Sequence, residues 1–254
     1  MTLSTAKIAT ANTSTAKIAL ITGANKGIGF EVARQIGRTG ATVLVGARNQ
    51  ALGQAAAAKL TAEGLNAHFL PIDLADNASI SAAAATISSD YGHLDILVNN
   101  AAIADPGDGP ASTVSFDAVE HTMRINFLGA VAVSQAMLPL LRKAPSARIV
   151  NVSSGLGSLT QNADPTWQHS AVKPLGYNAS KAALNMLTVH LAYELRDTPI
   201  KVNSSDPGYT ATDLNGNRGT QTVPEGAAET IRLALLPDDG PTGTYSANEG
   251  IVPW

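Results

Sequence analysis

Apolar and polar positions alternate in two distinct patterns from Ile18 to the C-terminus. Short runs of aliphatic and β-branched residues predict strands, and the longer alanine-rich stretches between them carry a helical spacing. The predicted strands span Ile18–Thr22, Thr42–Val45, His68–Pro71, Leu94–Asn99, Arg148–Ser153, Lys201–Ser205 and Thr244–Ser246. The predicted helices span Ile28–Gly37, Gln50–Glu63, Ala78–Tyr91, Phe116–Leu141, Tyr177–Leu195 and Glu225–Leu236. Such alternation is typical of a parallel sheet covered by helices, so we predict an α/β fold of Rossmann type, a doubly wound sheet of about seven parallel strands.

The domain organisation follows from the length of the chain and from its lack of linkers. A chain of 254 residues, 44% of them hydrophobic, is long enough for one large α/β domain. Proline and glycine are spread between the periodic segments, and no long flexible or charged linker divides the chain. We therefore expect a single domain over residues 16–254. Residues 1–15 are mostly small and polar, and we predict a flexible extension there.

Composition argues against several classes of partner. The formal net charge of −3 provides no basic footprint for nucleic acid or for an anionic membrane surface. We find neither a secretory signal nor an uncharged stretch long enough to span a bilayer, and we expect no membrane association. The absence of cysteine rules out disulfides and is compatible with a cytoplasmic location. The five histidines lack the spacing of metal ligands, so we predict no metal site.

A glycine-rich segment directly follows the first predicted strand. Gly23, Gly27 and Gly29 have the spacing G-x-x-x-G-x-G, which differs from the more familiar G-x-G-x-x-G of dinucleotide-binding proteins. Glycine allows a tight turn and a close approach of the backbone to a ligand, and the start of the following helix favours an anion. The segment is therefore either a seat for a phosphate group or a strand-to-helix turn without a ligand.

Polar residues at other strand ends suit a nucleotide. Arg48 stands where many NAD-binding chains place a carboxylate, and together with Lys26 it suits the 2′-phosphate of NADP. The alternative is that both are solvated surface charges. Asp73 could accept a hydrogen bond from an adenine amino group, or it could cap a turn. Asn99-Asn100-Ala101 would allow the backbone close to a cofactor, although two consecutive asparagines are also an ordinary turn signal.

Candidate catalytic groups occur in the second half of the chain. Tyr177 and Lys181 are four residues apart on one predicted helix face, and an ammonium beside a phenol favours the phenolate and lowers its pKa. Ser153 and Ser154 end the fifth predicted strand, where a hydroxyl could polarise a substrate oxygen. A Tyr-x-x-x-Lys pair alone is a weak motif. Its position along the same sheet edge as the glycine turn and the serine pair is what favours catalysis.

With these motifs in place, the chain resembles the compact branch of the short-chain dehydrogenase/reductase family, and within it the carbonyl reductase group. The motifs that carry the resemblance, from Lys17 to about Trp254, are Thr22–Gly29, Asn99–Ala101, Asn126, Ser153–Ser154, Tyr177-x-x-x-Lys181 and Pro207–Gly208. The resemblance implies a dinucleotide-binding catalytic domain with Asn126, Ser154, Tyr177 and Lys181 as the catalytic set; Ser153 is the fallback for Ser154. It implies cofactor contacts at Gly23, Asn25, Lys26, Gly27, Ile28, Gly29, Arg48, Asp73, Leu74, Asn100, Ala101, Tyr177, Lys181, Pro207, Gly208, Thr210 and Thr212.

The resemblance also implies an activity, namely NADPH-dependent and reversible reduction of a ketone or aldehyde to an alcohol. Ser154 and Tyr177 would bind the carbonyl oxygen, Tyr177 would supply the proton, and NADPH would supply the hydride. Lys181 would lower the pKa of Tyr177 and bind the nicotinamide ribose, and Asn126 would hold a water that connects Lys181 to solvent. Two alternatives are a nucleotide-sensing regulatory protein on the same scaffold and an extended-branch sugar epimerase or dehydratase. The short segment after Leu236 argues against the second.

Two departures from the family pattern affect the substrate pocket. The segment between Ser154 and Tyr177 is longer than usual and contains residues 162–169, which we interpret as an inserted loop with Trp167 either as a substrate contact or as a loop anchor. Residues 209–223 are rich in glycine, threonine and asparagine and have the character of a lid. We expect residues 103–114, 155–176 and 209–223 to shape the pocket for a small carbonyl or alcohol substrate. The sequence leaves the substrate, the stereochemistry and the choice between monomer and homo-oligomer open.

Overall fold

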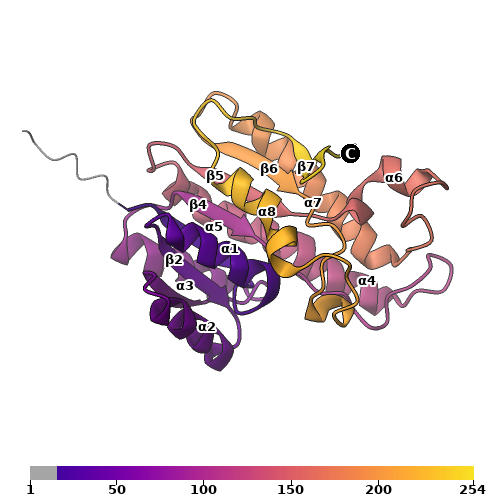
Figure 1. Cartoon of the computed structure of the whole chain (residues 1–254), viewed down its shortest axis with the longest axis horizontal. Coiled ribbons are helices and arrows are strands. Elements are labelled where there is room, and N and C mark those ends of the chain that lie inside the picture. Colours follow the sequence, from indigo (N-terminus) through magenta and orange to yellow (C-terminus); the bar gives the residue numbers. More distant parts are fainter. Residues whose placement is uncertain (1–15) are drawn as a thin grey trace, which may run out of the picture.

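The computed structural model describes residues 16–254, so the extension predicted for residues 1–15 lies outside the described residues. An eight-stranded sheet forms the centre, with the strand order β3-β2-β1-β4-β5-β6-β7-β8 (Figure 1). Seven strands are parallel, as predicted, and β8 pairs antiparallel with β7. The strands are β1 (Ile18–Thr22), β2 (Thr42–Ala47), β3 (Ala67–Pro71), β4 (Ile96–Asn99), β5 (Arg148–Val152), β6 (Lys201–Ser205), β7 (Tyr245–Ala247) and β8 (Gly250–Ile251).

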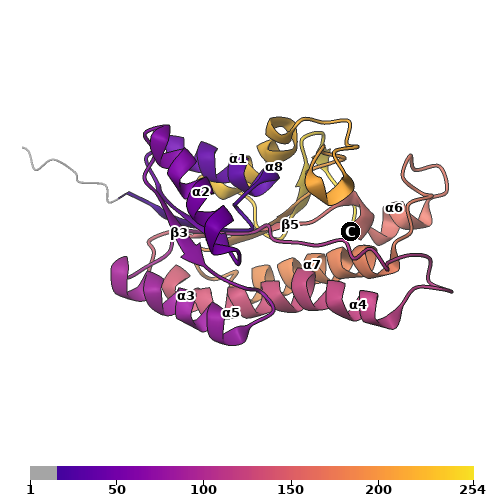
Figure 2. The same cartoon turned by 90° about the horizontal axis from the view of Figure 1, so that it is seen from below.

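Helices cover both faces of the sheet (Figure 2). One face carries α1 (Gly27–Arg38), α2 (Gln50–Ala62) and α8 (Val223–Ala234), and the other carries α3 (Asn77–Asp90), α4 (Phe116–Met123), α5 (Ala130–Leu141) and α7 (Leu175–Glu194). Each face has its own apolar core. Val32 and Leu60 belong to the first, and Ile87 and Met137 belong to the second. Because both faces are covered, the strands β1, β2, β4 and β5 are buried at every position, which explains why their sequences are mostly apolar.

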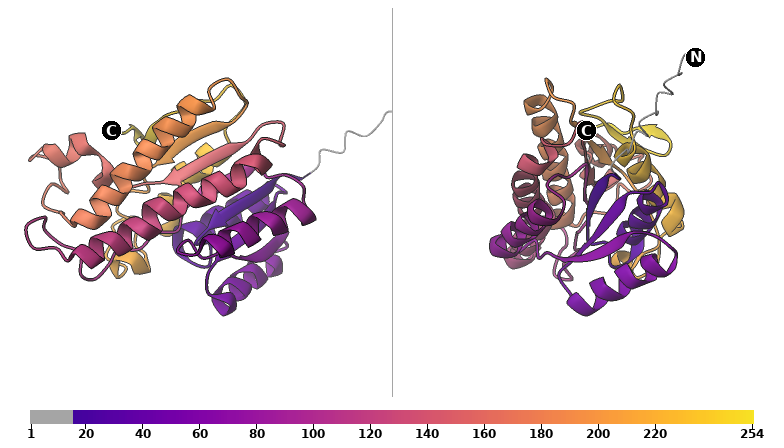
Figure 3. Two further views of the ribbon diagram at one scale, coloured as in Figure 1. Left: turned by 180° about the vertical axis from the view of Figure 1, so that it is seen from behind. Right: turned by 90° about the vertical axis from the view of Figure 1, so that its left-hand side faces the viewer.

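The segment predicted as one helix over Phe116–Leu141 is helical throughout but changes its winding. A π-helical turn, η1 (Arg124–Gly129), separates α4 from α5 and contains Asn126. π-Helical turns inside α-helices occur frequently at functional sites. The stretch has the length of a membrane-spanning helix, and an 18-residue window within it has a mean hydropathy of 1.3, but half of that window is buried inside the protein. It runs alongside α7, which it contacts, as Figure 3 shows from behind.

Several short elements were not predicted. They are the 3-10 helices η2 (Gly155–Gly157) and η3 (Asp213–Asn215), the short helix α6 (Leu159–Ala163) and the strand β8. Each is too short to show a hydrophobic period, which is the signal that sequence interpretation depends on. Elsewhere the boundaries differ from prediction by one or two residues. The helix α7 begins at Leu175, two residues before the predicted start, so Tyr177 is the third residue of the helix and not the first.

A buried polar network connects the sheet to the helices near the carboxyl ends of the strands. The Asn99 amide donates to Ser134 Oγ (3.0 Å) and to Asn151 Oδ1 (2.9 Å), and the Asn151 amide donates to Thr188 Oγ1 (2.7 Å). Thr188 in turn shares a hydrogen bond of 2.7 Å with Ser204. A network of this kind holds β4, β5 and β6 in one register against α5 and α7. The strand ends that carry the candidate site therefore rest on a rigid base.

Candidate active site

The glycine turn after β1 is held by side chains from the end of β4. The Asn100 amide donates to Thr22 O (2.8 Å), and Thr22 Oγ1 accepts from the backbone N–H groups of Asn100 (3.0 Å) and Ala101 (3.1 Å). The turn leaves no room for larger residues, because a methyl group at Gly29 would collide with the Asn100 amide and lie 2.7 Å from Gly23 O. The structure thus brings Gly23, Gly29, Asn100 and Ala101 together, as predicted for the cofactor site.

The start of α1 fits a phosphate group. No side chain caps this helix and its first turn contains no acidic residue, whereas Asn49 caps α2 and Asp76 caps α3. The first backbone N–H groups of a helix need acceptors, and here the protein supplies none from a side chain. Such a helix start binds anions through these N–H groups and through the helix dipole. Asn25, Gly27 and Ile28, three of the predicted cofactor contacts, lie at this helix start.

The two basic residues predicted for the 2′-phosphate are in different situations. Lys26 Nζ forms an ion pair with Asp213 at 2.8 Å, and both side chains are exposed. Arg48 follows β2 and is exposed, and within residues 16–254 it forms no ion pair. A free guanidinium at this strand end can bind a phosphate in a bidentate manner. Arg48 is therefore better placed for this role than Lys26.

The other predicted cofactor residues lie along the same sheet edge. Asp73 caps a turn, because its Oδ1 accepts from Ala75 N at 3.0 Å, and this is the alternative that the sequence left open. Leu74 is buried against the helix at Gly129. After β6, Gly208 has a positive φ of 64°, and the Thr210 hydroxyl donates to Pro207 O at 2.7 Å. Thr212 approaches Gly27, so residues 209–223 contact the glycine turn.

Ser154 and Tyr177 meet where β5 ends and α7 begins. Ser154 Oγ caps η2 by accepting from Leu156 N (3.3 Å), and the same hydroxyl interacts with the Tyr177 side chain. Ser153, the fallback residue, is fully buried, and its hydroxyl faces the backbone oxygen of Lys181 at 3.5 Å. The geometry therefore favours Ser154 over Ser153 as the partner of Tyr177.

Asp108 fixes the position of Tyr177, a role that no sequence motif indicated. Its carboxylate accepts from Gly176 N (2.8 Å) and from Tyr177 N (2.7 Å), and it thereby caps the first turn of α7. A carboxylate that accepts from the free N–H groups of a helix start is a stabilising cap. Asp108 belongs to the segment 103–114 and precedes Gly176 and Tyr177 by 68 and 69 positions in the sequence. No local pattern could therefore reveal this cap.

Burial decides the protonation of Tyr177 and Lys181, the candidate catalytic pair. It raises the pKa of Tyr177 to about 12, the Ser154 hydroxyl acts in the opposite direction, and the Asp206 carboxylate raises it further. Burial lowers the pKa of Lys181 to about 8, while Asp206 opposes this. The Lys181 ammonium donates to Val152 O at 2.7 Å and lies 5.6 Å from the centre of the Tyr177 ring. Lys181 does not produce the lowered Tyr177 pKa that was expected of it, because burial dominates and only the Ser154 hydroxyl acts against it, and the phenol keeps its proton at neutral pH.

Asn126 connects three segments through its side chain. Its Oδ1 accepts from Ile103 N (2.8 Å), and its amide donates to Ile103 O (2.9 Å) and to Ser180 Oγ (3.0 Å). The π-helical turn η1 is thereby joined to the segment after β4 and to α7. Both hydrogens of the Asn126 amide are thus used by protein groups, and they are not available to a water.

Tyr245 is a further part of the site that the sequence did not indicate. It is buried on β7, and its hydroxyl donates to Ser154 O at 2.6 Å. Its ring stacks on Trp254 with the ring centroids 5.4 Å apart. Trp254 O accepts from the backbone N–H of Thr160 (3.0 Å) and from its hydroxyl (2.7 Å), which joins the C-terminus to α6. Figure 1 shows α6 and the C-terminus at the same end of the molecule.

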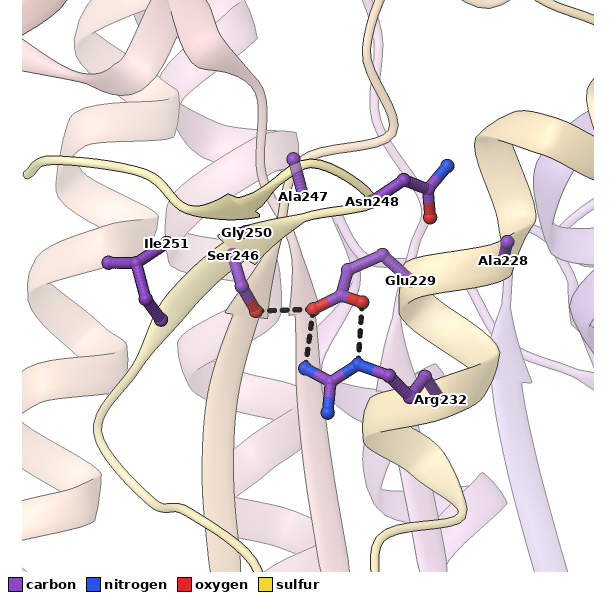
Figure 4. Close-up of a pocket in the computed structure, with 8 residues that line it drawn as sticks. All are labelled: Ala228, Glu229, Arg232, Ser246, Ala247, Asn248, Gly250 and Ile251. Carbon is purple, nitrogen blue, oxygen red and sulfur yellow. Dashed lines mark hydrogen bonds and ion pairs between the residues drawn. The ribbon is translucent and has the colours of Figure 1, made fainter.

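A cavity of about 470 Å³ lies elsewhere, between α8, β7 and β8 (Figure 4). Its buried Glu229 is bound by Arg232 through two hydrogen bonds of 2.7 Å and by the Ser246 hydroxyl. None of the candidate catalytic residues lines it. The carboxylate of Glu229 is already paired with Arg232 and Ser246. We therefore place the candidate active site at the carboxyl ends of the strands and not in this cavity. Within residues 16–254 no cluster of three or more metal-binding side chains occurs.

Comparison with known proteins identifies the family of the chain. A family model described as short chain dehydrogenase matches residues 17–222. The chain is 34% identical to carbonyl reductase [NADPH] 1 of Sus scrofa, with 95% of each chain covered. It is 30% identical to (+)-neomenthol dehydrogenase of Capsicum annuum, with 92% of this chain and 96% of that protein covered. Among solved structures, NADPH-bound carbonyl reductase from chicken fatty liver superposes with a TM-score of 0.82 at 28% identity, covering 94% and 99% of the two chains.

Proposed function

Since the chain belongs to the short-chain dehydrogenase/reductase family, we propose that it is an NADPH-dependent reductase that converts ketones or aldehydes to alcohols. The observation that carries this proposal is the Ser154–Tyr177 pair at the carboxyl ends of the sheet, with a phenol that burial keeps protonated. A protonated phenol beside a serine hydroxyl can bind a carbonyl oxygen and give it a proton as negative charge develops there.

The cofactor we propose is NADPH or NADP+. The uncapped start of α1 supplies backbone N–H groups for the pyrophosphate, and Arg48 supplies a cation for the 2′-phosphate. Relatives named as NADPH enzymes support this choice. NADPH, when bound, supplies the hydride of the reaction. We further propose Asn25, Ile28, Asp73, Leu74, Pro207, Gly208, Thr210 and Thr212 as the remaining contacts along the edge.

Lys181 and Asn126 support the proton donor. The Lys181 ammonium is anchored on Val152 O at the end of β5, directly before the serine pair, and its pKa of about 8 keeps most of it charged at neutral pH. It is thus positioned to hold a ribose hydroxyl and to return a proton to Tyr177 after each turnover. Asn126 locks the segment at Ile103 to α7, so that both sides of the site keep a fixed separation.

The opposite reaction, oxidation of an alcohol with NADP+, uses the same groups in reverse. A regulatory protein that only senses the nucleotide is the less favoured function. It would need the glycine turn and Arg48, but it would have no use for the convergence of Ser154, Tyr177 and Lys181.

Replacement of Tyr177 by Phe tests the proposal. We expect NADPH oxidation with a reactive ketone to fall by about 10²- to 10⁴-fold, because general acid catalysis is lost, while the affinity for NADPH, measured by fluorescence titration, stays unchanged. Replacement of the exposed Tyr193 by Phe is the matched control and is expected to have no effect. Near-normal turnover by the Tyr177 variant would contradict the mechanism, and a wild-type protein that binds NADPH but reduces no carbonyl compound would favour the sensor.

A further inference from the structure

A carboxylate that the mechanism above does not use lies at the end of β6. Asp206 directly follows this strand, which lies between β5 and β7 in the sheet. Its backbone N–H donates to Ser246 O at 2.8 Å, and the preceding Ser205 O accepts from Ser153 N at 2.7 Å. Both neighbouring strands therefore hold the main chain at Asp206, next to the strand end that carries Ser154.

The Asp206 carboxylate joins two turns of the site. Its Oδ1 accepts from Gly208 N at 2.9 Å, and the carboxylate also accepts from Gly155 N. Gly155 directly follows Ser154, and Gly208 belongs to the Pro207–Gly208 turn that is proposed to contact the cofactor. Hydrogen bonds to an ionised acceptor are stronger than those between neutral groups. One side chain thus connects the substrate side of the site to its cofactor side.

The contact between Asp206 and Gly155 has no slack. A methyl group placed on Gly155 would lie 3.0 Å from Asp206 Oδ2, 3.1 Å from Gln161 Oε1 and 3.2 Å from the Trp167 ring. These separations are shorter than ordinary van der Waals contact, so the three side chains close the space around Gly155. Because the packing is tight here, the position of the carboxylate determines the position of the turn that carries Ser154.

The charge of Asp206 acts on the candidate catalytic pair. The ionisable groups around its carboxylate are Tyr177 and Lys181 from α7, Tyr245 from β7, Glu249 from the turn after β7 and His169 from the inserted loop. Within residues 16–254 no lysine or arginine forms an ion pair with Asp206. Burial raises the pKa of Asp206 itself, and the N–H groups of Gly208 and Gly155 oppose this rise. The negative charge raises the pKa of both Tyr177 and Lys181, so it offsets part of what burial does to the Lys181 ammonium.

From these contacts we infer that Asp206 is a positioning residue for the reaction: its carboxylate holds the Ser154–Gly155 turn against the Pro207–Gly208 turn, and its charge compensates the buried Lys181 ammonium. This inference rests on the proposed reductase function and adds a residue to its site. An asparagine at position 206 would keep one acceptor oxygen but would lose the second acceptor and the charge. An aspartate that only stabilised its own turn would have no effect on Lys181.

Titration of Lys181 in the free enzyme tests the charge. The ¹³C NMR signal of its ε-carbon, identified by its loss in Lys181→Met, should titrate near pH 8 in the wild-type protein and about one pH unit lower in Asp206→Asn. Asp197→Asn makes the same change in net charge at an exposed position beyond the end of α7, and it should leave the midpoint unchanged. An unchanged midpoint in Asp206→Asn would overturn the inference.

Steady-state kinetics with a reactive ketone test the positioning. In Asp206→Asn we expect kcat at pH 7 to fall about tenfold, because one backbone N–H loses its acceptor, with a much smaller change in KM. The alkaline limb of the pH profile should move to lower pH, since Tyr177 and Lys181 both lose the negative charge beside them. Asp206→Glu keeps the charge but adds a methylene group to the close contact at Gly155, so it should restore the Lys181 midpoint without restoring kcat.

Gly155→Ala provides a second test if Asp206→Asn folds poorly. The added methyl group presses on Asp206 Oδ2 and leaves the charge in place, so kcat should fall while the Lys181 midpoint stays near pH 8. Wild-type kcat in both variants would overturn the inference and leave the reductase function intact. A wild-type protein that binds NADPH but reduces no ketone would overturn the reductase function, and the inference with it.

Discussion

The two halves of the candidate site are constructed differently. On the cofactor side, the glycine turn, the start of α1 and Asn100 are held by short contacts between backbone groups and one or two small side chains. On the substrate side, Ser154 and Tyr177 depend on side chains from distant segments, namely Asp108, Tyr245 and the C-terminal Trp254. The charged groups differ as well. Lys26 is exposed, whereas Lys181 is buried.

This difference follows from what each half has to do. A nucleotide phosphate is recognised by backbone N–H groups, and these are placed by local conformation. Proton transfer to a substrate needs side chains at defined positions with shifted pKa values, and only packing from several elements provides burial and position together. We therefore expect substitutions on the two sides to have separable effects on cofactor binding and on turnover.

Of the substitutions that compare the two sides, Gly29→Ala should cause the largest change, and on the cofactor side. The added methyl group meets Gly23 O and the Asn100 amide, and overpacking of this kind costs about 2–3 kcal/mol, which corresponds to a rise in the NADPH Kd of roughly 30- to 160-fold. Fluorescence titration with NADPH measures this change. Gly40→Ala is the control, since Gly40 has a positive φ of 90° but open space around it. It should lower stability by about 1 kcal/mol and leave the Kd unchanged. Equal effects of the two substitutions would mean that close packing of the turn is unimportant.

Tyr245→Phe should affect turnover on the substrate side. The variant leaves Ser154 O without its donor, which costs about 1–3 kcal/mol. Without this bond the Ser154 backbone shifts, and the Ser154 hydroxyl moves with it. We expect kcat to fall by about tenfold, with the Kd for NADPH unchanged. Steady-state kinetics at saturating NADPH and a titration of the free enzyme separate these quantities. A parallel loss of NADPH affinity would show that the two halves are not independent.

Lys181→Met should have the smallest effect in free energy, and it tests the contrast between buried and exposed lysine. Removal of the buried ammonium is expected to raise the free energy of unfolding at pH 7 by on the order of 1 kcal/mol, after the lost bond to Val152 O is counted. Lys26→Met should change it by less than about 0.5 kcal/mol, because its ion pair with Asp213 is exposed.

The pH dependence gives the sign of the effect. The pKa of Lys181 is lowered to about 8 in the folded protein from 10.5, so between these values the unfolded chain holds a proton that the folded protein has released. The wild-type protein therefore gains stability as the pH rises through this window, and the advantage of Lys181→Met should shrink. The raised pKa of Tyr177 affects both proteins alike and cancels in the comparison. Denaturant unfolding at several pH values measures this, and an advantage that grows with pH would contradict the burial of a charged Lys181.

The interpretation of the chain from its sequence was accurate where structure is local and periodic. The seven parallel strands, the six long helices and the glycine turn each leave a signal in a short window of residues. The order of motifs along the sheet edge was also correct, because parallel strands bring their carboxyl ends to one side. The choice between Ser153 and Ser154 leaves no such local signal, because it depends on the direction in which each side chain points.

By itself, then, the sequence determined the fold class, the family and the chemical groups available for catalysis, because strands, helices and motifs depend on spacing along the chain. Only the tertiary structure decided the protonation of Tyr177, the cap that Asp108 places on α7 and the bond between Tyr245 and Ser154. It also brought Asp206, Gln161 and Trp167 around one point. Desolvation and contacts between residues far apart in sequence arise only when the chain is packed, and no local pattern of residues records them.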